Sequence, residues 1–200
     1  MFITFEGTEG CGKSTLIQHL ANRLKAANLP HVITREPGGS SVAESIRNLI
    51  LHQEMNAMAE LFLYEAARAE HFHQTILPAL KAGKIVICDR FTDSTLAYQG
   101  FARGLDLKTI EQLNRIATHN TKPDLTFFLD LPVEIGLSRA SDPNKFEREG
   151  INFQKKVRKG FLYSIQKNPK RWRVLKVKQK TPDELADEVM AILNQKRGRA

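Results

Sequence analysis

The sequence predicts a three-layer α/β fold, in which a parallel sheet of five strands is covered by helices on both faces. Short apolar runs and helical patterns alternate along all 200 residues, an order that is typical of parallel sheets with helical crossovers. The first apolar run leads directly through a Gly-rich stretch into a helix. No internal repeat, linker or low-complexity tract interrupts the pattern, so we expect residues 1–200 to form a single domain.

Five apolar runs predict the strands of this sheet. They lie at residues 1–5, 31–34, 84–89, 124–130 and 172–177. The third run is apolar almost throughout, which predicts a central strand that is buried on both faces.

Helical patterns separate the apolar runs. They lie near residues 13–27, 41–51, 57–82, 93–99, 106–119, 132–139, 153–166 and 182–195. In the first pattern, Leu16, Leu20 and Leu24 form an apolar stripe at helical spacing. Pro78 predicts a kink or break in the third. The run Thr181–Glu184 predicts a capping box at the start of the last helix, with proline at its first position.

Composition limits the class of protein. With 42% hydrophobic and 26% charged residues, the chain is typical of a soluble globular protein. No apolar run approaches the roughly 20 residues that span a bilayer, and the N-terminal residues do not resemble a signal peptide, so we expect no membrane association. We expect Cys11 and Cys88 to be free thiols in a reducing, cytoplasmic location.

The net charge of +8 has two interpretations, which are nucleic-acid binding and small polyanionic substrates. Basic residues are spread along the chain, with modest clusters at residues 155–159 and 170–173. No nucleic-acid motif accompanies them, so we favour small phosphates and expect no nucleic-acid partner.

The stretch Gly7–Ser14 has the spacing G-x-x-x-x-G-K-S of a phosphate-binding loop, in the strand–loop–helix setting that the motif requires. Its glycines allow a tight turn that directs backbone N–H groups at a phosphate. Lys13 would reach the outer phosphates, and the Ser14 hydroxyl would bind a magnesium ion. The positive end of the following helix dipole faces the same anions.

Residues at the carboxyl ends of parallel strands meet in one crevice. Asp89 ends the third strand, where a carboxylate can hold magnesium through water; capping of the next helix is the alternative. Arg35 and Arg90 would hold a second phosphate there, unless they form surface salt bridges with neighbours such as Glu36. Two phosphate sites in one crevice indicate transfer between two bound phosphates rather than hydrolysis alone.

A polar segment at residues 138–148 breaks the helical periodicity and contains Arg139, Lys145 and Arg148. Phosphoryl transfer needs charge neutralisation and exclusion of water, and a mobile basic lid supplies both. An ordinary solvated loop is the alternative.

The run Asn120–Asp124 contains T-K-x-D, which resembles a guanine-reading motif of GTPases. That motif should follow a strand, whereas this run precedes one, so we do not expect guanine recognition.

Five motifs together resemble the bacterial thymidylate kinase family. In chain order they are Phe5–Thr15, Thr34–Gly39, Asp89–Gly100, Pro123–Pro132 and Gly136–Arg139. The order and spacing of the motifs are specific, and the match covers most of the chain up to about the last fifty residues. The resemblance implies a P-loop NTPase fold with a lid at about residues 139–150, usually as a homodimer, and the reaction of ATP and dTMP to ADP and dTDP with magnesium.

The resemblance also implies which residues hold the ligands. Those for ATP are Gly7, Thr8, Glu9, Gly10, Cys11, Gly12, Lys13, Ser14 and Thr15, with Arg139 packed on the adenine. Those for dTMP are Glu9, Arg35, Tyr64, Arg68, Arg90, Thr95, Tyr98 and Gln99. Ser14 and Asp89 would hold the metal.

Individual roles within the dTMP site follow from the same resemblance. Arg35 and Arg90 would hold the phosphate, Glu9 would meet the sugar hydroxyl, and Arg68 would bond the thymine edge. Tyr64 stands where the family usually stacks a phenylalanine on the base, so its hydroxyl needs a partner or water. By helical periodicity alone, Arg68 and Tyr64 would belong to a salt bridge and to the edge of the core. Thr95, Tyr98 and Gln99 match the wall beside the sugar and base, where the tyrosine would exclude a ribose 2′-OH.

The catalytic residues that the resemblance implies are Lys13, Arg90, Glu9, Lys145 and Arg148. One kind of thymidylate kinase carries an arginine in the phosphate loop, where Gly10 stands here, and the other kind supplies it from the lid. Lys145 stands where the lid arginine is usual, and lysine cannot make a bidentate fork. Either Lys145 therefore acts as a point charge or Arg148 takes the role.

Two other functions fit the same phosphate loop: a kinase for another nucleotide such as dUMP, and a regulator that binds nucleotide without transferring phosphate. The pair Arg35 and Arg90 discriminates against the regulator, because a pure switch does not need a second phosphate site.

Overall fold

The computed structural model describes residues 1–139 and 145–198. Within these residues, five strands form one sheet in the order β2-β3-β1-β4-β5, and neighbouring strands are parallel. The strands are β1 Phe2–Glu6, β2 His31–Arg35, β3 Ile85–Asp89, β4 Leu125–Asp130 and β5 Trp172–Lys176. The predicted parallel sheet of five strands is therefore confirmed.

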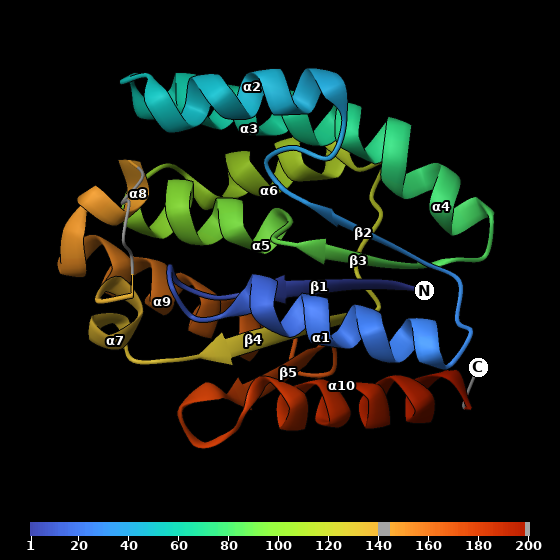
Figure 1. The fold of residues 1–200 in the computed structure, drawn as a ribbon. Helices are drawn as coiled ribbons and strands as arrows, with labels where there is room; N and C mark the ends of the chain where they lie inside the picture. The colour runs from blue at the N-terminus through green and yellow to red at the C-terminus, as the bar shows by residue number, and fades with distance from the viewer. Residues whose placement is uncertain (140–144, 199–200) are drawn as a thin grey trace.

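Helices cover both faces of the sheet (Figure 1). On one face, α1 (Lys13–Ala26) and α10 (Pro182–Arg197) pack side by side. The remaining α-helices are α2 Ser41–His52, α3 Ala57–His71, α4 Leu77–Lys81, α5 Thr92–Thr95, α6 Leu107–Ala117, α7 Val133–Leu137, α8 Lys145–Arg148 and α9 Gly150–Lys167. Of these, α4 and α9 contribute to the cover of the opposite face, and α2 packs against α3 above it.

Alternating side chains along β1 divide the core into two halves. Ile3 and Phe5 point toward α1 and α10, where they share a cluster with Leu16 and Leu20. Phe2 points to the other face and packs in a cluster with Phe72. Both faces of the strand are buried, as expected for the centre of a covered parallel sheet. The face of Phe2 also carries two buried polar side chains, Thr4 and Glu6.

Two of the predicted helices contain π-helical segments. The helix predicted over residues 57–82 runs without interruption through α3, a π-helical segment η1 (Phe72–Ile76) and α4. The irregularity predicted at Pro78 therefore takes the form of a wider turn before the proline, not a break at it. Pro78 lies in the first turn of α4, directly after this wider turn. Proline has no backbone N–H to donate, and the first turn of a helix does not require one. The second segment, η2 (Leu96–Ala102), follows α5 and extends the helix beyond its predicted end. Wide turns of this kind are frequent at functional sites, and η2 carries Tyr98 and Gln99.

The C-terminal third agrees with the sequence except in the polar segment. Residues 145–148, predicted as loop, form α8; residues 140–144 of the predicted lid lie outside the described residues. A 3₁₀ turn (Val177–Gln179) precedes α10. The predicted capping box is present, since Thr181 Oγ1 accepts from the Glu184 N–H at 3.2 Å and the glutamate side chain accepts from the Thr181 N–H at 2.7 Å.

All strand arrows in Figure 1 point to the side of the molecule on which α7 and α8 lie. The carboxyl ends of the strands therefore meet there, and this edge carries the loop between β1 and α1. Among the helices that the structure describes, none is long and apolar enough to cross a membrane.

Candidate active site

The loop between β1 and α1 is tightly packed against α7. Gly10 has a φ of 67°, and a Cβ atom there would lie 2.0 Å from the carbonyl oxygen of Gly136. Only glycine satisfies both conditions. Gly12 (φ 92°) is the N-cap of α1, and it has no side chain that could cap the helix. The backbone N–H groups of the first helical turn are therefore available to an anion.

The Lys13 side chain lies inside this loop. Its Nζ atom donates to the carbonyl oxygens of Gly7 and Thr8 at 3.3 and 3.2 Å, and the residue is buried. The ammonium group is thus held at the centre of the curved backbone, where the sequence predicts the outer phosphates.

Ser14 and Asp89 meet beside the loop. The Ser14 hydroxyl donates to Oδ2 of Asp89 at 3.1 Å. The other carboxylate oxygen, Oδ1, is buried and has no hydrogen-bond partner among the described residues. A hydroxyl next to an unsatisfied carboxylate oxygen fits a magnesium site, because hard cations prefer oxygen ligands.

A cavity of about 490 Å³ opens over the phosphate loop. The residues that line it are Glu9, Gly10, Cys11, Gly12, Lys13, Ser14, Thr15, Arg35, Glu36, Arg47, Asp89, Arg90 and Arg139. The structure therefore brings Lys13, Arg35 and Arg90 together, as the positions at strand ends predict. Arg139 also reaches the loop, where its Nη1 atom donates to the carbonyl oxygen of Gly10 at 3.4 Å.

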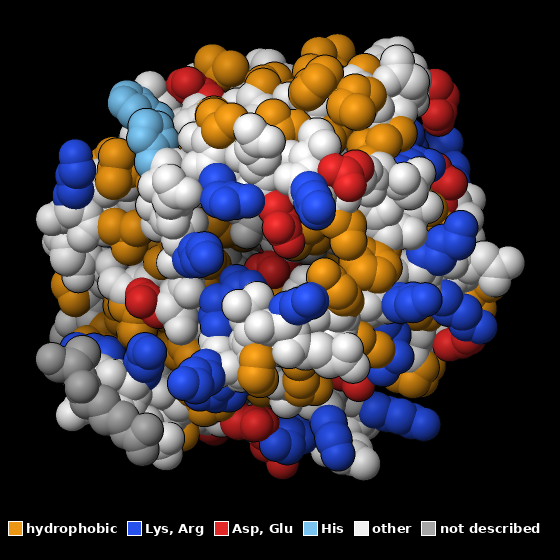
Figure 2. All heavy atoms as spheres, turned by 180° about the vertical axis from the view of Figure 1, so that it is seen from behind, with side chains coloured by type: hydrophobic (Ala, Val, Ile, Leu, Met, Phe, Trp, Pro, Cys, Tyr) orange, Lys and Arg blue, Asp and Glu red, His pale blue; other side chains and the backbone are white. Residues whose placement is uncertain are grey.

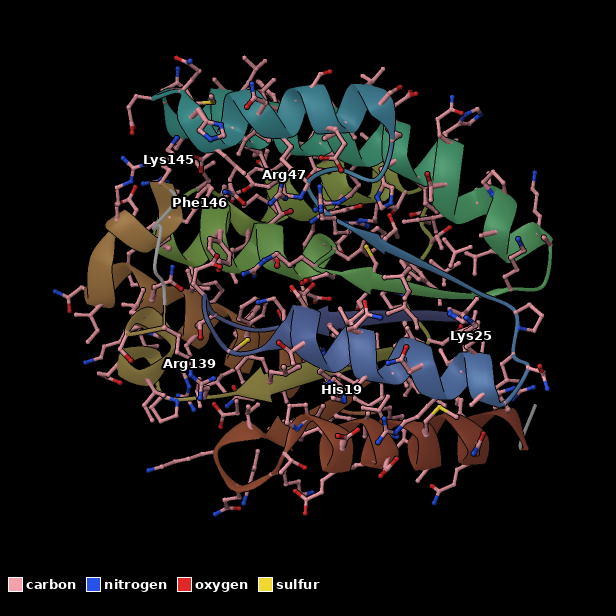
Figure 3. The ribbon with its side chains drawn as sticks, in the orientation of Figure 1. His19, Lys25, Arg47, Arg139, Lys145 and Phe146 are labelled. Atoms are coloured by element: carbon pink, nitrogen blue, oxygen red, sulfur yellow. The ribbon has the colours of Figure 1, made fainter. Side chains whose placement is uncertain are left out.

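Arg47 is a cation of this cavity that the sequence reasoning missed. It projects from α2 toward the end of β2 (Figure 3), where Nη1 donates to the Pro37 carbonyl oxygen at 2.8 Å. Burial and the neighbouring guanidinium of Arg35 lower the pKa of Arg47. Cations crowded in this way favour an anion between them. The Arg35 guanidinium is paired with the Glu44 carboxylate at 2.9 Å and is more than half exposed.

Arg90 joins the end of β3 to the phosphate loop. Its backbone is left-handed, with a φ of 70°, and its N–H donates to the Phe5 carbonyl oxygen. The guanidinium donates to the Gly7 carbonyl oxygen and to Glu9 Oε1, both at 2.9 Å. Burial lowers the pKa of Arg90, but the Glu9 carboxylate outweighs burial and raises it well above the usual value.

Glu9 is the carboxylate at the centre of the site. Its Oε1 atom also accepts from the Tyr98 hydroxyl at 2.7 Å. Burial raises the pKa of Glu9, but the charges of Arg90 and Lys13 outweigh burial and lower the pKa below the ordinary value. The carboxylate is therefore ionised and joins the phosphate loop to η2.

A deeper cavity, of about 80 Å³, adjoins the first. The residues that line it are Glu9, Glu36, Pro37, Arg47, Leu51, Tyr64, Arg68, Arg90, Phe91, Ser94, Thr95, Tyr98, Gln99 and Phe146. All six side chains that the resemblance assigns to the sugar and base of dTMP line it. Phe146 of α8 was not predicted; its ring lies 6.4 Å from that of Tyr64 and 5.7 Å from that of Tyr98.

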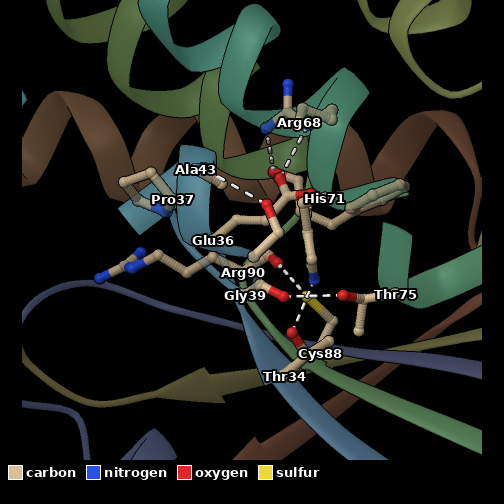
Figure 4. A network of polar contacts seen from close by, with 12 residues as sticks. Thr34, Glu36, Pro37, Gly39, Ala43, Arg68, His71, Thr75, Cys88 and Arg90 are labelled. Atoms are coloured by element: carbon tan, nitrogen blue, oxygen red, sulfur yellow. Dashed lines mark hydrogen bonds and ion pairs between the residues drawn. The ribbon is translucent and has the colours of Figure 1, made fainter. Parts of the chain in front are cut away.

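Arg68 lines this cavity and is almost fully buried. Figure 4 shows its contact with Glu36. Arg68 donates to Glu36 Oε2 at 2.8 Å, Glu65 Oε1 at 2.7 Å, Asn114 Oδ1 at 2.6 Å and the Phe91 carbonyl oxygen at 3.3 Å. In the part of the chain that the structure describes, four of its five N–H groups thus have partners. One N–H on Nη2 is left for a ligand.

Glu36 is in turn held by His71. The Nδ1–H of His71 donates to Glu36 Oε1 at 3.0 Å, and Nε2 lies 2.6 Å from Thr34 Oγ1. With Cys88, these two residues place three potential metal ligands within 4.8 Å of one another. Both imidazole nitrogens have protein partners, and the Cys88 thiol donates to the Arg90 carbonyl oxygen at 3.0 Å. Burial raises the pKa of that thiol well above its usual value, so we interpret the cluster as a hydrogen-bonded support.

The structure does not place Lys145 and Arg148 at the phosphate loop. Lys145 is buried, with Nζ 3.0 Å from Glu60 Oε2 and 3.3 Å from the Gln53 carbonyl oxygen. Both residues instead line a cavity with Leu51, on the side of α8 that faces the end of α2. The sequence could not reveal this placement, because Glu60 is distant in the chain and lies within an ordinary helical pattern.

Glu6 supports the turn that carries Arg90. At the end of β1, its Oε1 atom accepts from the Phe91 N–H at 2.8 Å, and Oε2 accepts from the Ser94 hydroxyl at 2.6 Å. Burial and the neighbouring Asp93 raise the pKa of Glu6 to about 8. Glu6 was not predicted, because in the sequence it is only the last residue of an apolar run.

A separate cavity, of about 310 Å³, lies between α6 and the C-terminal half of α9. None of the phosphate-loop residues lines it. The side chain of Asn114, which bonds Arg68, separates it from the deeper cavity of the site.

The fold and the site together define a P-loop protein in which a phosphate loop adjoins a second cavity lined by Arg47, Arg68 and Arg90. The thymidylate kinase family model matches residues 5–189. The chain is 49% identical to a thymidylate kinase of Citrifermentans bemidjiense, over 87% of this chain and 83% of that protein. It is 46% identical to one of a Synechococcus species, over 96% and 94%.

A solved structure agrees with these relatives. The crystal structure of thymidylate kinase from Ehrlichia chaffeensis superposes with a TM-score of 0.81 at 39% identity, covering 96% of this chain and 98% of that one. The chain belongs to the thymidylate kinase family.

We expect Glu6→Gln to alter how stability depends on pH. Between pH 4.5, the ordinary value, and about 8, folded Glu6 keeps a proton that the unfolded chain releases. Rising pH therefore favours the unfolded state across this window. Glutamine does not titrate, so the melting temperature of Glu6→Gln relative to the wild type should rise by several degrees from pH 5 to 8 and level off above.

Thermal denaturation between pH 5 and 9 measures this difference. Glu44→Gln is the control, because hydrogen bonding and Arg35 outweigh burial and lower the pKa of Glu44, so its effect on stability lies below this range. A constant difference between Glu6→Gln and the wild type across the range would contradict the interpretation.

Proposed function

We propose that this chain transfers the γ-phosphoryl group of ATP to dTMP, giving ADP and dTDP on the route to dTTP. The observation that carries the proposal is that the phosphate-loop cavity and the deeper cavity share Glu9, Glu36, Arg47 and Arg90. Two phosphorylated ligands would therefore meet end to end at Arg90. This arrangement suits transfer between two phosphates, and a nucleotide-binding regulator would not need it.

The triphosphate would occupy the phosphate loop. The backbone of residues 7–15, the Lys13 ammonium and the start of α1 supply N–H groups and positive charge. Arg139, which bonds the loop at Gly10, would pack on the adenine. Ser14 and Asp89 would hold a magnesium ion, which when bound neutralises charge on the transferred phosphoryl group.

The phosphate of the acceptor would lie between the arginines at the strand ends. Arg35, Arg47 and Arg90 come from three different elements and converge on one cavity. Bidentate guanidinium groups suit a phosphate dianion and orient it for in-line attack. Glu9 and Tyr98, which share a hydrogen bond, would meet the sugar, and the tyrosine would leave no room for a 2′-OH.

The base would be read by the floor of the deeper cavity. Arg68 has one N–H group to offer, and Gln99 directs its amide nitrogen at Glu60, which leaves its carbonyl oxygen for the ligand. The buried Thr95 hydroxyl, which has no partner among the described residues, lies in the same wall. A donor beside an acceptor complements the O4 and N3–H edge of thymine. Uracil has the same edge, so dUMP is the alternative acceptor.

Charge in the transition state would come from Lys13 and Arg90, which already lie at the loop. Lys145 or Arg148 of the lid, at about residues 139–150, would add to it only after moving from the positions described above. Their distance from the phosphate loop favours Arg139 as the first lid cation to contact the donor.

We also propose that residues 1–200 form one domain, that two copies form a dimer, and that the protein acts in the cytoplasm. All described strands belong to one sheet, which supports a single domain. Cys11 and Cys88 are free and buried, which fits a reducing compartment. Several large apolar side chains are 40–65% exposed on α2, α3 and α6: Val42, Leu49, Met58, Phe62 and Ile116. Figure 2 shows hydrophobic side chains gathered across the top of the molecule, where α2 and α3 lie. An exposed apolar patch of this kind favours a protein interface.

dTMP should raise the melting temperature of the protein more than other nucleoside monophosphates do. At one hundred times its dissociation constant, a ligand stabilises the folded state by about 2.7 kcal/mol, or roughly 5–10 °C for a chain of this size. A thermal-shift panel of dTMP, dUMP, dCMP, dAMP and dGMP measures this. ADP formation from ATP that depends on dTMP completes the test. Equal shifts from dCMP, or no ADP formation, would rule the proposal out.

Ser14→Ala should weaken the magnesium site without abolishing nucleotide binding. Loss of an oxygen ligand should raise the Mg²⁺ concentration for half-maximal turnover about 10-fold or more. Turnover measured across a magnesium titration gives this value. Ser45→Ala, which removes an exposed hydroxyl of α2, is the control. An unchanged magnesium requirement in Ser14→Ala would remove Ser14 from the metal site.

Phe62→Glu should separate the two copies of the proposed dimer. A buried charge in an apolar interface has no partner and costs several kcal/mol. Sedimentation velocity at micromolar protein should show a monomer for this variant and a dimer for the wild type. Val174→Glu, an exposed apolar site on β5 outside the patch, should remain dimeric. A monomeric wild type would refute the dimer.

A further inference from the structure

Glu60 of α3 is a buried carboxylate that joins the base end of the cavity to α8. It is 1% exposed. Its Oε1 atom accepts from Gln99 Nε2 at 2.9 Å and from Arg103 Nε at 3.3 Å. Its Oε2 atom lies 3.0 Å from Lys145 Nζ, which Figure 3 shows beneath the end of α2. One carboxylate thus contacts an amide that faces the ligand cavity and two cations that do not line it.

The contact with Glu60 determines which way round the Gln99 amide lies. A glutamine amide has a donor end and an acceptor end, which can exchange by a half turn. The Glu60 carboxylate is paired with two cations, Arg103 and Lys145, so its oxygens serve as hydrogen-bond acceptors. The NH₂ end must therefore face Glu60, and the carbonyl oxygen must face away from it.

The side-chain oxygen of Gln99 that faces away from Glu60 can accept a hydrogen bond from a ligand in the cavity. No hydrogen bond to this oxygen is present among the described residues, and Gln99 lines the deeper cavity together with Arg68. An acceptor beside the free N–H of Arg68 matches an N–H beside a carbonyl group. Thymine presents that edge, whereas cytosine presents an amino group beside an unprotonated nitrogen, the reverse order.

We propose that Glu60 is a positioning residue that sets base selectivity, by holding the Gln99 amide in the orientation that accepts thymine and rejects cytosine. The inference rests on the proposed function, because it takes the acceptor to be a pyrimidine monophosphate. It adds a residue that does not line the cavity and acts through Gln99 alone. Arg103 and Lys145 compensate its buried charge, so Lys145 of α8 contributes to base selectivity without lining the cavity.

The test compares dTMP with dCMP as acceptors in the full-length protein with ATP and magnesium. Glu60→Gln keeps the shape but offers both a donor and an acceptor, so Gln99 can take either orientation. The ratio of kcat/KM for dTMP to that for dCMP should fall at least about 10-fold, since a mispaired buried polar group is strongly disfavoured. Glu149→Gln is the matched control: it removes another carboxylate that pairs with Arg103 but has no hydrogen bond to Gln99. Its ratio should stay within about twofold of the wild type.

A ratio within twofold of the wild type in a Glu60→Gln protein that melts normally would overturn the inference and leave the proposed function intact. If the wild type does not phosphorylate dTMP, the proposed function fails. The shifts in melting temperature that dTMP and dCMP give in the same variants then still test the orientation of the Gln99 amide. If Glu60→Gln does not fold, hydrogen exchange of the Gln99 side-chain amide in the wild type decides. Slow exchange supports the bond to Glu60, and exchange as fast as that of an exposed glutamine refutes it.

Discussion

The ion pair between Arg90 and Glu9 is the interaction on which the site depends, because both residues line the two cavities. Arg90 has a left-handed backbone (φ 70°), which costs about 1–3 kcal/mol for a residue with a side chain. Hydrogen bonds from its N–H to Phe5 and from its guanidinium to Gly7 offset that cost. One side chain thus joins β3 to the phosphate loop, so the positions of the two cavities that it lines cannot vary independently.

The deeper cavity depends on a different balance, between buried charges. Removing a guanidinium from water is expensive, and only well-placed acceptors offset the cost. Arg68 has such acceptors in Glu36, Glu65 and Asn114, and the first of these is held in turn by His71. Burial raises the pKa of Glu36, but the charge of Arg68 outweighs it and lowers the pKa below the ordinary value, which keeps the pair ionised. Because these hydrogen bonds hold the Arg68 guanidinium, its remaining N–H group is already ordered before a ligand binds.

The sequence was sufficient wherever function depends on local spacing. The loop Gly7–Ser14 could be placed because its spacing alone positions the backbone, and Arg35 and Arg90 because parallel strands end at one edge. Arg47 could not be placed, since its helix has an ordinary amphipathic pattern and only the packing of α2 over β2 turns it into the cavity. The same limit applies to Lys145. Its position in the chain resembles that of a lid cation, but its location in the structure is set by an ion pair with Glu60. Sequence spacing cannot predict a contact between residues so far apart in the chain.

The position of α8 connects these observations. Gln154 of α9 is buried, with Oε1 3.5 Å from the Glu9 N–H and Nε2 donating to the Phe146 carbonyl oxygen at 3.1 Å. α8 is therefore fastened to the phosphate loop on one side, and Lys145 fastens it to α3 on the other. Phe146 lies against Tyr98 and limits the deeper cavity to about 80 Å³. In the proposed function, Phe146 of α8 would therefore restrict the size of the base, while Arg68 and Gln99 would bond its edge. A purine would then be excluded by its size even if its edge matched, and cytosine would be excluded by its hydrogen-bonding edge even though it fits.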